Sequence, residues 1–246
     1  MTYEKPLDTS TRLEGTDFSG VQLHGPDFEN TIVTDGWFVN ADFSGDIKGL
    51  VINGVEVAPF IEAELDRRSP ERVLLRASDP KELAEAWMVL EKMWASTVTR
   101  ARRLPEPLLH VRVNEEWSFV ETLRHLIMAI DCWHGRMIEG NPHPYHPWGL
   151  AGPFLSDPAS LGLDFAATPS LDEVLAVHQQ RFAEVGHTIR SVTPSELERV
   201  CTPPSTPGHP QVPRTLVQCL HTILNEEWEH NRYANRDLEV LFTRSN

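Results

Sequence analysis

Four long segments of the sequence repeat apolar residues with the period of an α-helix, which constrains the fold more than any other feature. The segments cover residues 80–103, 118–138, 170–192 and 214–242. Asp79 before Pro80 is an N-cap signal for the first segment, and Ser170 with Glu173 forms a capping box for the third. The proline-rich loops between the segments are too long for a simple up-and-down order. We therefore predict a mainly α fold, a four-helix bundle with crossover connections.

Residues 11–45 follow a different period, in which blocks of five residues carry an apolar residue at the centre. The central residues are Leu13, Phe18, Leu23, Phe28, Val33, Phe38 and Phe43. The pattern resembles that of pentapeptide-repeat proteins, whose blocks each form one face of a square, right-handed β-helix. An irregular region rich in turn residues is the alternative. At four blocks per coil, seven blocks make just under two coils, so we expect a short β-helix stub that needs another surface to pack against.

The change of period divides the chain into two regions. Residues 11–56 form the pentapeptide-repeat-like β segment, and residues 57–246 form the helical bundle. A turn at Asn53-Gly54 leads from one to the other, and a short helix is expected to begin near Pro59.

Charge and composition narrow the classes of partner. The net charge of −14 disfavours binding to phosphate backbones and anionic lipids, so neither nucleic acid nor a membrane is an expected partner. The sequence contains no long apolar stretch and no signal-peptide pattern at its start. Three scattered cysteines are too few for a disulfide framework. We therefore expect a cytoplasmic protein.

Two of the predicted helices carry side chains that are typical metal ligands. His125 lies among apolar residues of the second helix, and Glu226 and His230 are four residues apart on the last. That spacing places the two side chains on one helix face, about 40° apart. Together the three residues predict a catalytic site for a divalent metal such as Zn, Ni or Fe(II). The alternatives are a core histidine with an ordinary hydrogen bond, and a solvated glutamate face.

These residues also carry a resemblance to a family. The stretch from Trp117 to His125 and the Glu-x-x-x-His element on the last helix resemble the DinB superfamily, over roughly residues 58–244. That superfamily includes the mycothiol-dependent maleylpyruvate isomerases and the thiol S-transferases. The resemblance implies a helical bundle in which His125 and His230 bind a divalent metal. Position 226 departs from the commoner His-x-x-x-His pattern, and its glutamate shifts the expected metal towards Zn, Fe(II) or Mn.

The loop after the second helix is unusually rich in aromatic and histidine residues. Tyr145, His146 and Trp148 follow the helix that carries His125, so we predict that they line a substrate pocket. Glu227 lies about 100° from Glu226 around the helix and is expected to lie outside the metal site.

The resemblance and the ligand pattern together favour a metal-dependent enzyme that acts on a small molecule. The expected reaction is thiol-dependent S-transfer with a low-molecular-weight thiol, or a related transfer or hydrolysis. The alternative is a non-catalytic stress-response or binding protein, with the bundle as scaffold and the repeat segment as docking surface. Large apolar side chains on the helices, namely Trp87, Trp94 and Trp133, also predict a homodimer.

Overall fold

The computed structural model describes residues 12–245, apart from residues 24, 153–154, 156 and 203–211. The chain divides into two compact units, Met1–Pro59 and Phe60–Asn246. Among the described residues, no helix is long and apolar enough to cross a membrane.

The period of five is visible in the backbone of the first unit. Every fifth residue has a left-handed conformation, with φ between 55° and 73°: Gly15, Gly20, Gly25, Asn30, Asp35 and Asn40. Backbone hydrogen bonds close turns after alternate central residues, from Val21 to Phe18, from Thr31 to Phe28 and from Ala41 to Phe38. The residues with positive φ at every fifth position are glycine, asparagine or aspartate because these residue types tolerate a left-handed backbone conformation.

The β-helix predicted for this segment is not observed. Within residues 12–50, outside residue 24, the chain forms turns and bends but no strand. The seven central side chains are each 53–61% exposed, so they do not form a closed core. Phe38 and Phe43 touch edge to face at 5.9 Å between ring centroids. The physical reason is length, because fewer than two coils leave each apolar face without a neighbouring coil to pack on. Thr11 lies outside the described residues.

Four long helices dominate the second unit, and their bounds agree with the apolar periodicity. They are α2 (Pro80–Ala101), α3 (Phe119–Ile130), α4 (Leu171–Ser191) and α6 (Leu216–Ser245). The Asp79 side chain caps α2 through the backbone N–H groups of Lys81 and Glu82. The Ser170–Glu173 capping box starts α4 as predicted. Beyond Ile130, α3 continues as a π-helix, η3 (Asp131–Ile138).

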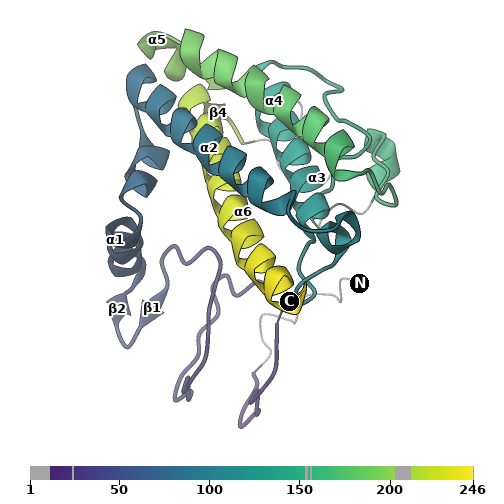
Figure 1. Ribbon diagram of the computed structural model, residues 1–246. Coiled ribbons are helices and arrows are strands. Elements are labelled where there is room, and N and C mark those ends of the chain that lie inside the picture. The colour runs from purple at the N-terminus through teal and green to yellow at the C-terminus, as the bar shows by residue number, and fades with distance from the viewer. Residues whose placement is uncertain (1–11, 24, 153–154, 156, 203–211, 246) are drawn as a thin grey trace. The chain divides into compact units, whose positions relative to one another are not determined.

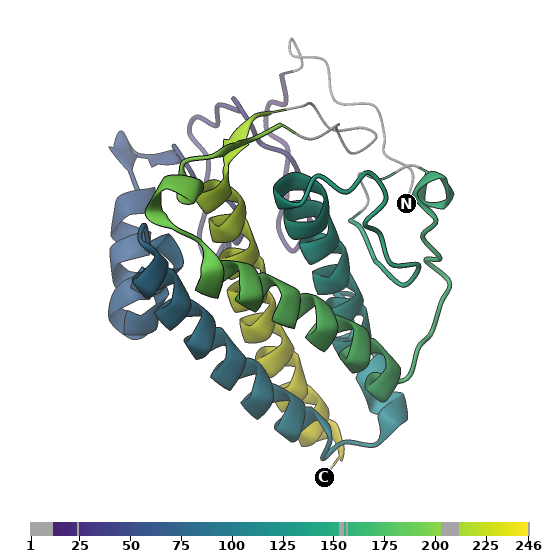
Figure 2. The same ribbon diagram turned by 90° about the horizontal axis from the view of Figure 1, so that it is seen from above.

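The order of the helices around the bundle differs from their order along the chain. Helix α3 packs on α4 and α6, and α2 packs on the same two helices. Consecutive helices α2 and α3 therefore lie mainly on a diagonal, as do α4 and α6, and Figures 1 and 2 show the four rods side by side. The loops that join diagonal helices must cross one end of the bundle. The predicted mainly α bundle with crossover connections is confirmed.

Short elements complete the described chain. The hairpin β1 (Val51–Ile52) and β2 (Val55–Glu56) turns at Asn53 and Gly54, both with positive φ, as the sequence predicted. Strands β3 (Val200–Cys201) and β4 (Arg214–Thr215) pair antiparallel before α6. The remaining elements are α1 (Ala58–Arg68), η1 (Pro70–Arg76), η2 (Glu106–His110), η4 (Pro158–Leu161) and α5 (Pro194–Leu197).

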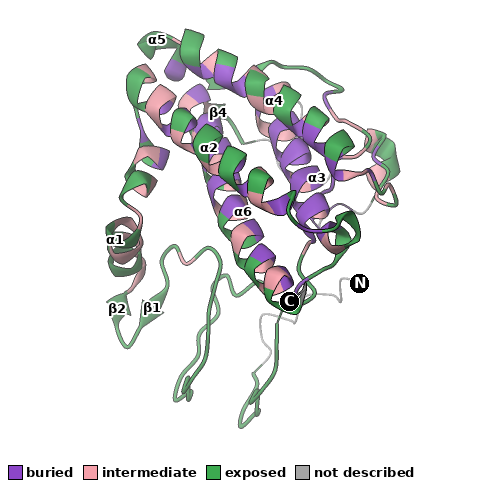
Figure 3. Cartoon of the chain, in the orientation of Figure 1, coloured by how far each residue is buried: buried purple, intermediate pink, exposed green. Residues whose placement is uncertain are grey.

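The core of the second unit lies between the four long helices, where buried residues face one another in Figure 3. Trp87 and Trp94 of α2 belong to this core rather than to an outer surface. Their burial removes them from the argument for a dimer, which stays a prediction.

Candidate metal centre

Helix α3 places His125 on the side that faces α6. A capping box between Ser118 and Glu121 fixes where the helix begins, and the helix then turns His125 out of the apolar core. The side chain keeps 15% of its surface exposed, and its Nδ1 lies 3.1 Å from the carbonyl oxygen of Leu150. The position of His125 is therefore fixed by its own helix and by the loop that contains Leu150.

Helix α6 presents Glu226 and His230 as an i, i+4 pair. The Nδ1 of His230 lies 2.9 Å from the backbone carbonyl oxygen of Glu226, one turn earlier. The Glu226 side chain is 31% exposed, so the pair sits at the edge of the core rather than inside it. The helical register alone brings these two side chains together.

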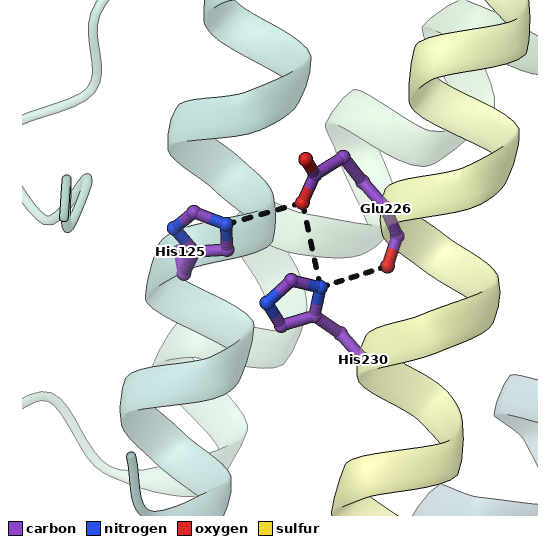
Figure 4. Close-up of side chains that lie close together, drawn as sticks. All are labelled: His125, Glu226 and His230. Carbon is purple, nitrogen blue, oxygen red and sulfur yellow. Dashed lines mark hydrogen bonds and ion pairs between the residues drawn. The ribbon is translucent and has the colours of Figure 1, made fainter. Parts of the chain in front are cut away.

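The three residues converge on one point, as Figure 4 shows. The Nε2 of His125 lies 3.2 Å from Oε2 of Glu226, and Nδ1 of His230 lies 3.4 Å from the same oxygen. One ligand atom from each of the three residues can be chosen so that all lie within 4.8 Å of one another. In the part of the chain that the structure describes, no other three His, Cys, Asp or Glu side chains form such a group.

The hydrogen bonds to backbone carbonyls fix the tautomer of both histidines. A carbonyl oxygen can only accept, so Nδ1 of His125 and Nδ1 of His230 each carry a proton. In a neutral imidazole the lone pair is then on Nε2. The Nε2 of His125 therefore faces a carboxylate oxygen, acceptor against acceptor, at 3.2 Å. This contact is attractive only when a cation, either a proton or a metal ion, lies between the two atoms.

The electrostatics put Glu226 and His230 in the forms that bind metal. Burial alone would raise the pKa of Glu226, but the hydrogen bond from His125 and the charges of both histidines lower it below 4.5. Burial lowers the pKa of His230 to about 4, and positive charge on His125 acts in the same direction. At neutral pH Glu226 is therefore an anion and His230 is a neutral imidazole.

Aromatic rings cover the site. The ring of Trp117 lies 4.4 Å from His125 and 6.2 Å from His230 between centroids, and Tyr233 contacts His230 edge to face at 5.9 Å. An ion pair between Glu116 and Arg236 ties the segment before α3 to α6. Neither Trp117 nor Tyr233 was predicted to lie at the site. The available signals were that Trp117 precedes the N-cap of the histidine helix and that Tyr233 follows His230 by three residues.

Buried Arg124 holds the loop that reaches the site. Its guanidinium donates to the carbonyl oxygens of Trp148, Asp164 and Ala167, at 2.9, 2.7 and 2.6 Å. The backbone N–H of Leu150 in turn donates to the Arg124 carbonyl oxygen. This network positions the Leu150 carbonyl that orients His125.

The three predicted pocket residues make their described contacts elsewhere. The backbone N–H of His146 donates to Asp131, the His146 ring touches Trp148 at 5.1 Å, and the guanidinium of Arg136 lies over the Tyr145 ring. The contacts with Asp131 and Arg136 join the loop to η3, and the loop meets His125 at Leu150 instead. The assignment of Tyr145, His146 and Trp148 to a substrate pocket stays a prediction.

Glu227 points away from the metal candidates and into the core. It is fully buried, and its Oε1 lies 3.1 Å from Nε2 of His178 on α4. Its second oxygen, Oε2, has no hydrogen-bond partner among the described residues. Glu227 is therefore outside the candidate site, as expected, but it is a structural residue rather than a solvated one.

Comparison with protein families identifies the bundle. The sequence model of the DinB superfamily matches residues 89–234, more than half of the chain and a range that includes all three candidate ligands. The chain belongs to the DinB superfamily. Proteins of this superfamily generally bind metal, and the His125, Glu226 and His230 group of the present DinB protein is a candidate for such a site. Searches of the curated proteins and of the solved structures gave no match.

Proposed function

We propose that this DinB protein is a divalent-metal-dependent enzyme whose metal is held by His125, Glu226 and His230. The observation that carries the proposal is the convergence of these three side chains, of which one ligand atom each lies within 4.8 Å of the others. Two imidazoles and one carboxylate suit Zn or Fe(II), with Mn and Ni as further candidates. Three protein ligands also leave coordination positions open for a small-molecule substrate.

The most favoured reaction is thiol-dependent S-transfer. A bound divalent metal would lower the pKa of a low-molecular-weight thiol, or of water in a related hydrolysis, so that the anion is present at neutral pH. The choice of a thiol as the nucleophile rests on the resemblance to thiol S-transferases, and the electrophile is a small molecule.

The side chains around the ligands have supporting roles. The carbonyl groups of Leu150 and Glu226 orient the two imidazoles and keep their Nε2 lone pairs available. Trp117 and Tyr233 shield the histidines from water on their side of the site. Since neither aromatic group carries charge at neutral pH, this wall suits an apolar part of a substrate.

Metal analysis of the purified protein tests the first part of the proposal. We expect one divalent metal per chain after reconstitution, and loss of that metal with a chelator. The Glu226→Gln variant should bind at least about tenfold more weakly because it loses the anionic ligand. The matched control is Glu229→Gln on the same helix, whose side chain pairs with Arg232 instead. Equal metal binding by both variants would contradict the ligand assignment.

A turnover assay tests the second part. The metal-loaded protein is mixed with a low-molecular-weight thiol and 1-chloro-2,4-dinitrobenzene, and thioether formation is followed by absorbance. We expect a rate above that of the chelated protein. If the protein binds one metal ion per chain but turns over none of several thiols and electrophiles, the transferase assignment is wrong and the metal-site assignment still holds.

A non-catalytic binding protein is the second candidate. The repeat segment favours it through apolar side chains that lie almost fully in solvent, Trp37 at 95% and Ile32 at 86% exposed. In that case the bundle is a scaffold and the repeat segment is a docking surface. Absence of both metal and turnover would make this candidate the better one.

A further inference from the structure

A cavity lies beside η3 and α4, and none of the three candidate metal ligands lines it. It has a volume of about 260 Å³ and lies between the π-helix η3, the loop that follows η3, and α4. Its polar lining consists of Asp131, His134, Glu139, Asn141, Arg181 and Glu184. The described lining includes no residue of α6, which supplies two of the three candidate metal ligands. The cavity is therefore a separate site.

The π-helix and one glycine shape this cavity. A π-helix is rare, and where it occurs it often marks a functional site. At Gly135, within η3, a Cβ atom would lie only 2.7 Å from Cβ of Pro144. Any other residue would push the Pro144 wall outward, so the glycine allows the loop to close over the cavity.

Asp131 and Arg181 form the floor of the cavity. Asp131 is 2% exposed, and its Oδ1 accepts from Nε of Arg181 at 2.7 Å while its Oδ2 accepts from the backbone N–H of His146 at 2.7 Å. Arg181 also reaches Oε2 of Glu184 at 3.4 Å through Nη1. The guanidinium is thus shared between two carboxylates and is not free to receive an anion.

His134 adds no charge to the lining. The residue is 6% exposed, its Nε2 lies 2.8 Å from the hydroxyl of Thr188, and burial lowers its pKa, so the ring is neutral at pH 7. A neutral imidazole adds no positive charge, so His134 does not repel an ammonium group in the cavity.

The net charge of the residues that line the cavity indicates which class of ligand it favours. Three carboxylates, from Asp131, Glu139 and Glu184, face one guanidinium, which leaves a formal charge of −2 at neutral pH. Carboxylates accept hydrogen bonds from an ammonium group and repel an anion. The volume is far larger than a bare metal ion needs and approaches the lower end of small-molecule pockets, about 300 Å³.

We propose that this cavity binds a small organic cation with a primary ammonium group. Glu139 and Glu184 accept from the ammonium at the rim, and neutral His134 lines the cavity without opposing the positive charge. The Asp131–Arg181 pair holds η3 and α4 together and supplies the rigid floor.

Calorimetric titration of the full, chelator-treated chain with 1,4-diaminobutane tests the proposal. Chelation removes any metal that could ligate an amine. The neutral and anionic comparisons are 1,4-butanediol and succinate, which have the same chain length. We expect the diamine to bind and the other two compounds to give no signal.

A chain of net charge −14 attracts any cation weakly, so binding in the cavity must be distinguished from this general attraction. Two double variants that remove the same number of charges make the distinction. The double variant Glu139→Gln, Glu184→Gln removes two partly exposed rim carboxylates, so the fold should be unaffected, and diamine binding should weaken about tenfold. The control Glu71→Gln, Glu198→Gln removes two exposed carboxylates outside the lining and should bind within about twofold of the unaltered chain. Equal weakening in the two variants, equal binding of the diol, or no diamine binding by the unaltered chain would each overturn the proposal.

Discussion

Glu226 and Glu227 are neighbours on α6, and each faces a histidine from another helix, yet their surroundings differ completely. Glu226 keeps 31% of its side chain exposed and meets two imidazoles, whereas Glu227 is fully buried and meets His178 alone. The difference follows from about 100° of helix rotation, which turns one carboxylate to the edge of the bundle and the other into its core.

Burial and the number of partners, not residue type, separate the candidate metal site from the buried pair. Oε1 of Glu227 lies 3.1 Å from Nε2 of His178 in the core, where their side chains are 0% and 4% exposed, and no third ligand from the described residues joins them. At Glu226 a second imidazole completes a three-ligand group with access from outside. A buried pair contributes little to net stability because its desolvation cost offsets its attraction, although loss of one partner is costly.

Replacement of His230 with alanine should have the largest effect on the open cluster. Metal binding should fall below detection, because two ligands no longer form a chelating group, while the helical circular dichroism stays unchanged. Metal content after reconstitution measures the result. The control is His221→Ala, which removes another histidine of α6 whose Nε2 bonds to the carbonyl oxygen of Ala77. A His230→Ala protein that keeps its metal would contradict the assignment of His230 as a ligand.

Replacement of Glu227 with leucine should have the opposite pattern. The change leaves His178 buried without its partner, and we expect the free energy of unfolding in urea to fall by about 3–5 kcal/mol. Metal stoichiometry should stay the same. The double variant His178→Leu, Glu227→Leu removes both polar groups and should recover most of that loss. Loss of metal in the folded single variant would show that the two clusters act as one.

The fold and the ligand pattern were readable from the sequence because both depend on local spacing. Helix ends followed from caps such as Asp79 and Ser170, and the pairing of Glu226 with His230 followed from helical register. The π-helical form of η3 was not predicted from the sequence. The Leu150 carbonyl and the Trp117 ring depend on loop paths that no local pattern encodes.

The repeat segment shows the other limit of sequence reasoning. Its period of five correctly marks the positions of the left-handed residues, which is a local property. A closed β-helix also needs stacked coils, a non-local property that the block pattern does not supply by itself.

The open cluster should also make the metal-free protein sensitive to acid. The folded-state pKa of His230 is about 4, below its ordinary value of 6.5, so its contribution to stability is present above pH 6.5 and is lost as the pH falls through 4. The loss amounts to roughly 3 kcal/mol at most. Asp131 acts in the opposite direction, since burial raises its pKa to about 6 and its contribution is lost as the pH rises. The test is therefore a difference between urea unfolding of the unaltered chain and of His230→Ala, from pH 4 to 7. An equal pH dependence in the two proteins would contradict the assignment.

The smallest expected effect concerns Trp117. Its ring lies 4.4 Å from His125, close enough for a quenching metal such as Ni²⁺ at the cluster to change its fluorescence, but it supplies no ligand. In Trp117→Phe the aromatic contact is largely kept, so metal affinity should change by less than about tenfold. The fluorescence response to metal should nevertheless be lost. The control is Trp133→Phe, which alters a residue at the edge of the core cluster and should keep the response. A full response in Trp117→Phe would contradict the placement of the metal beside His125.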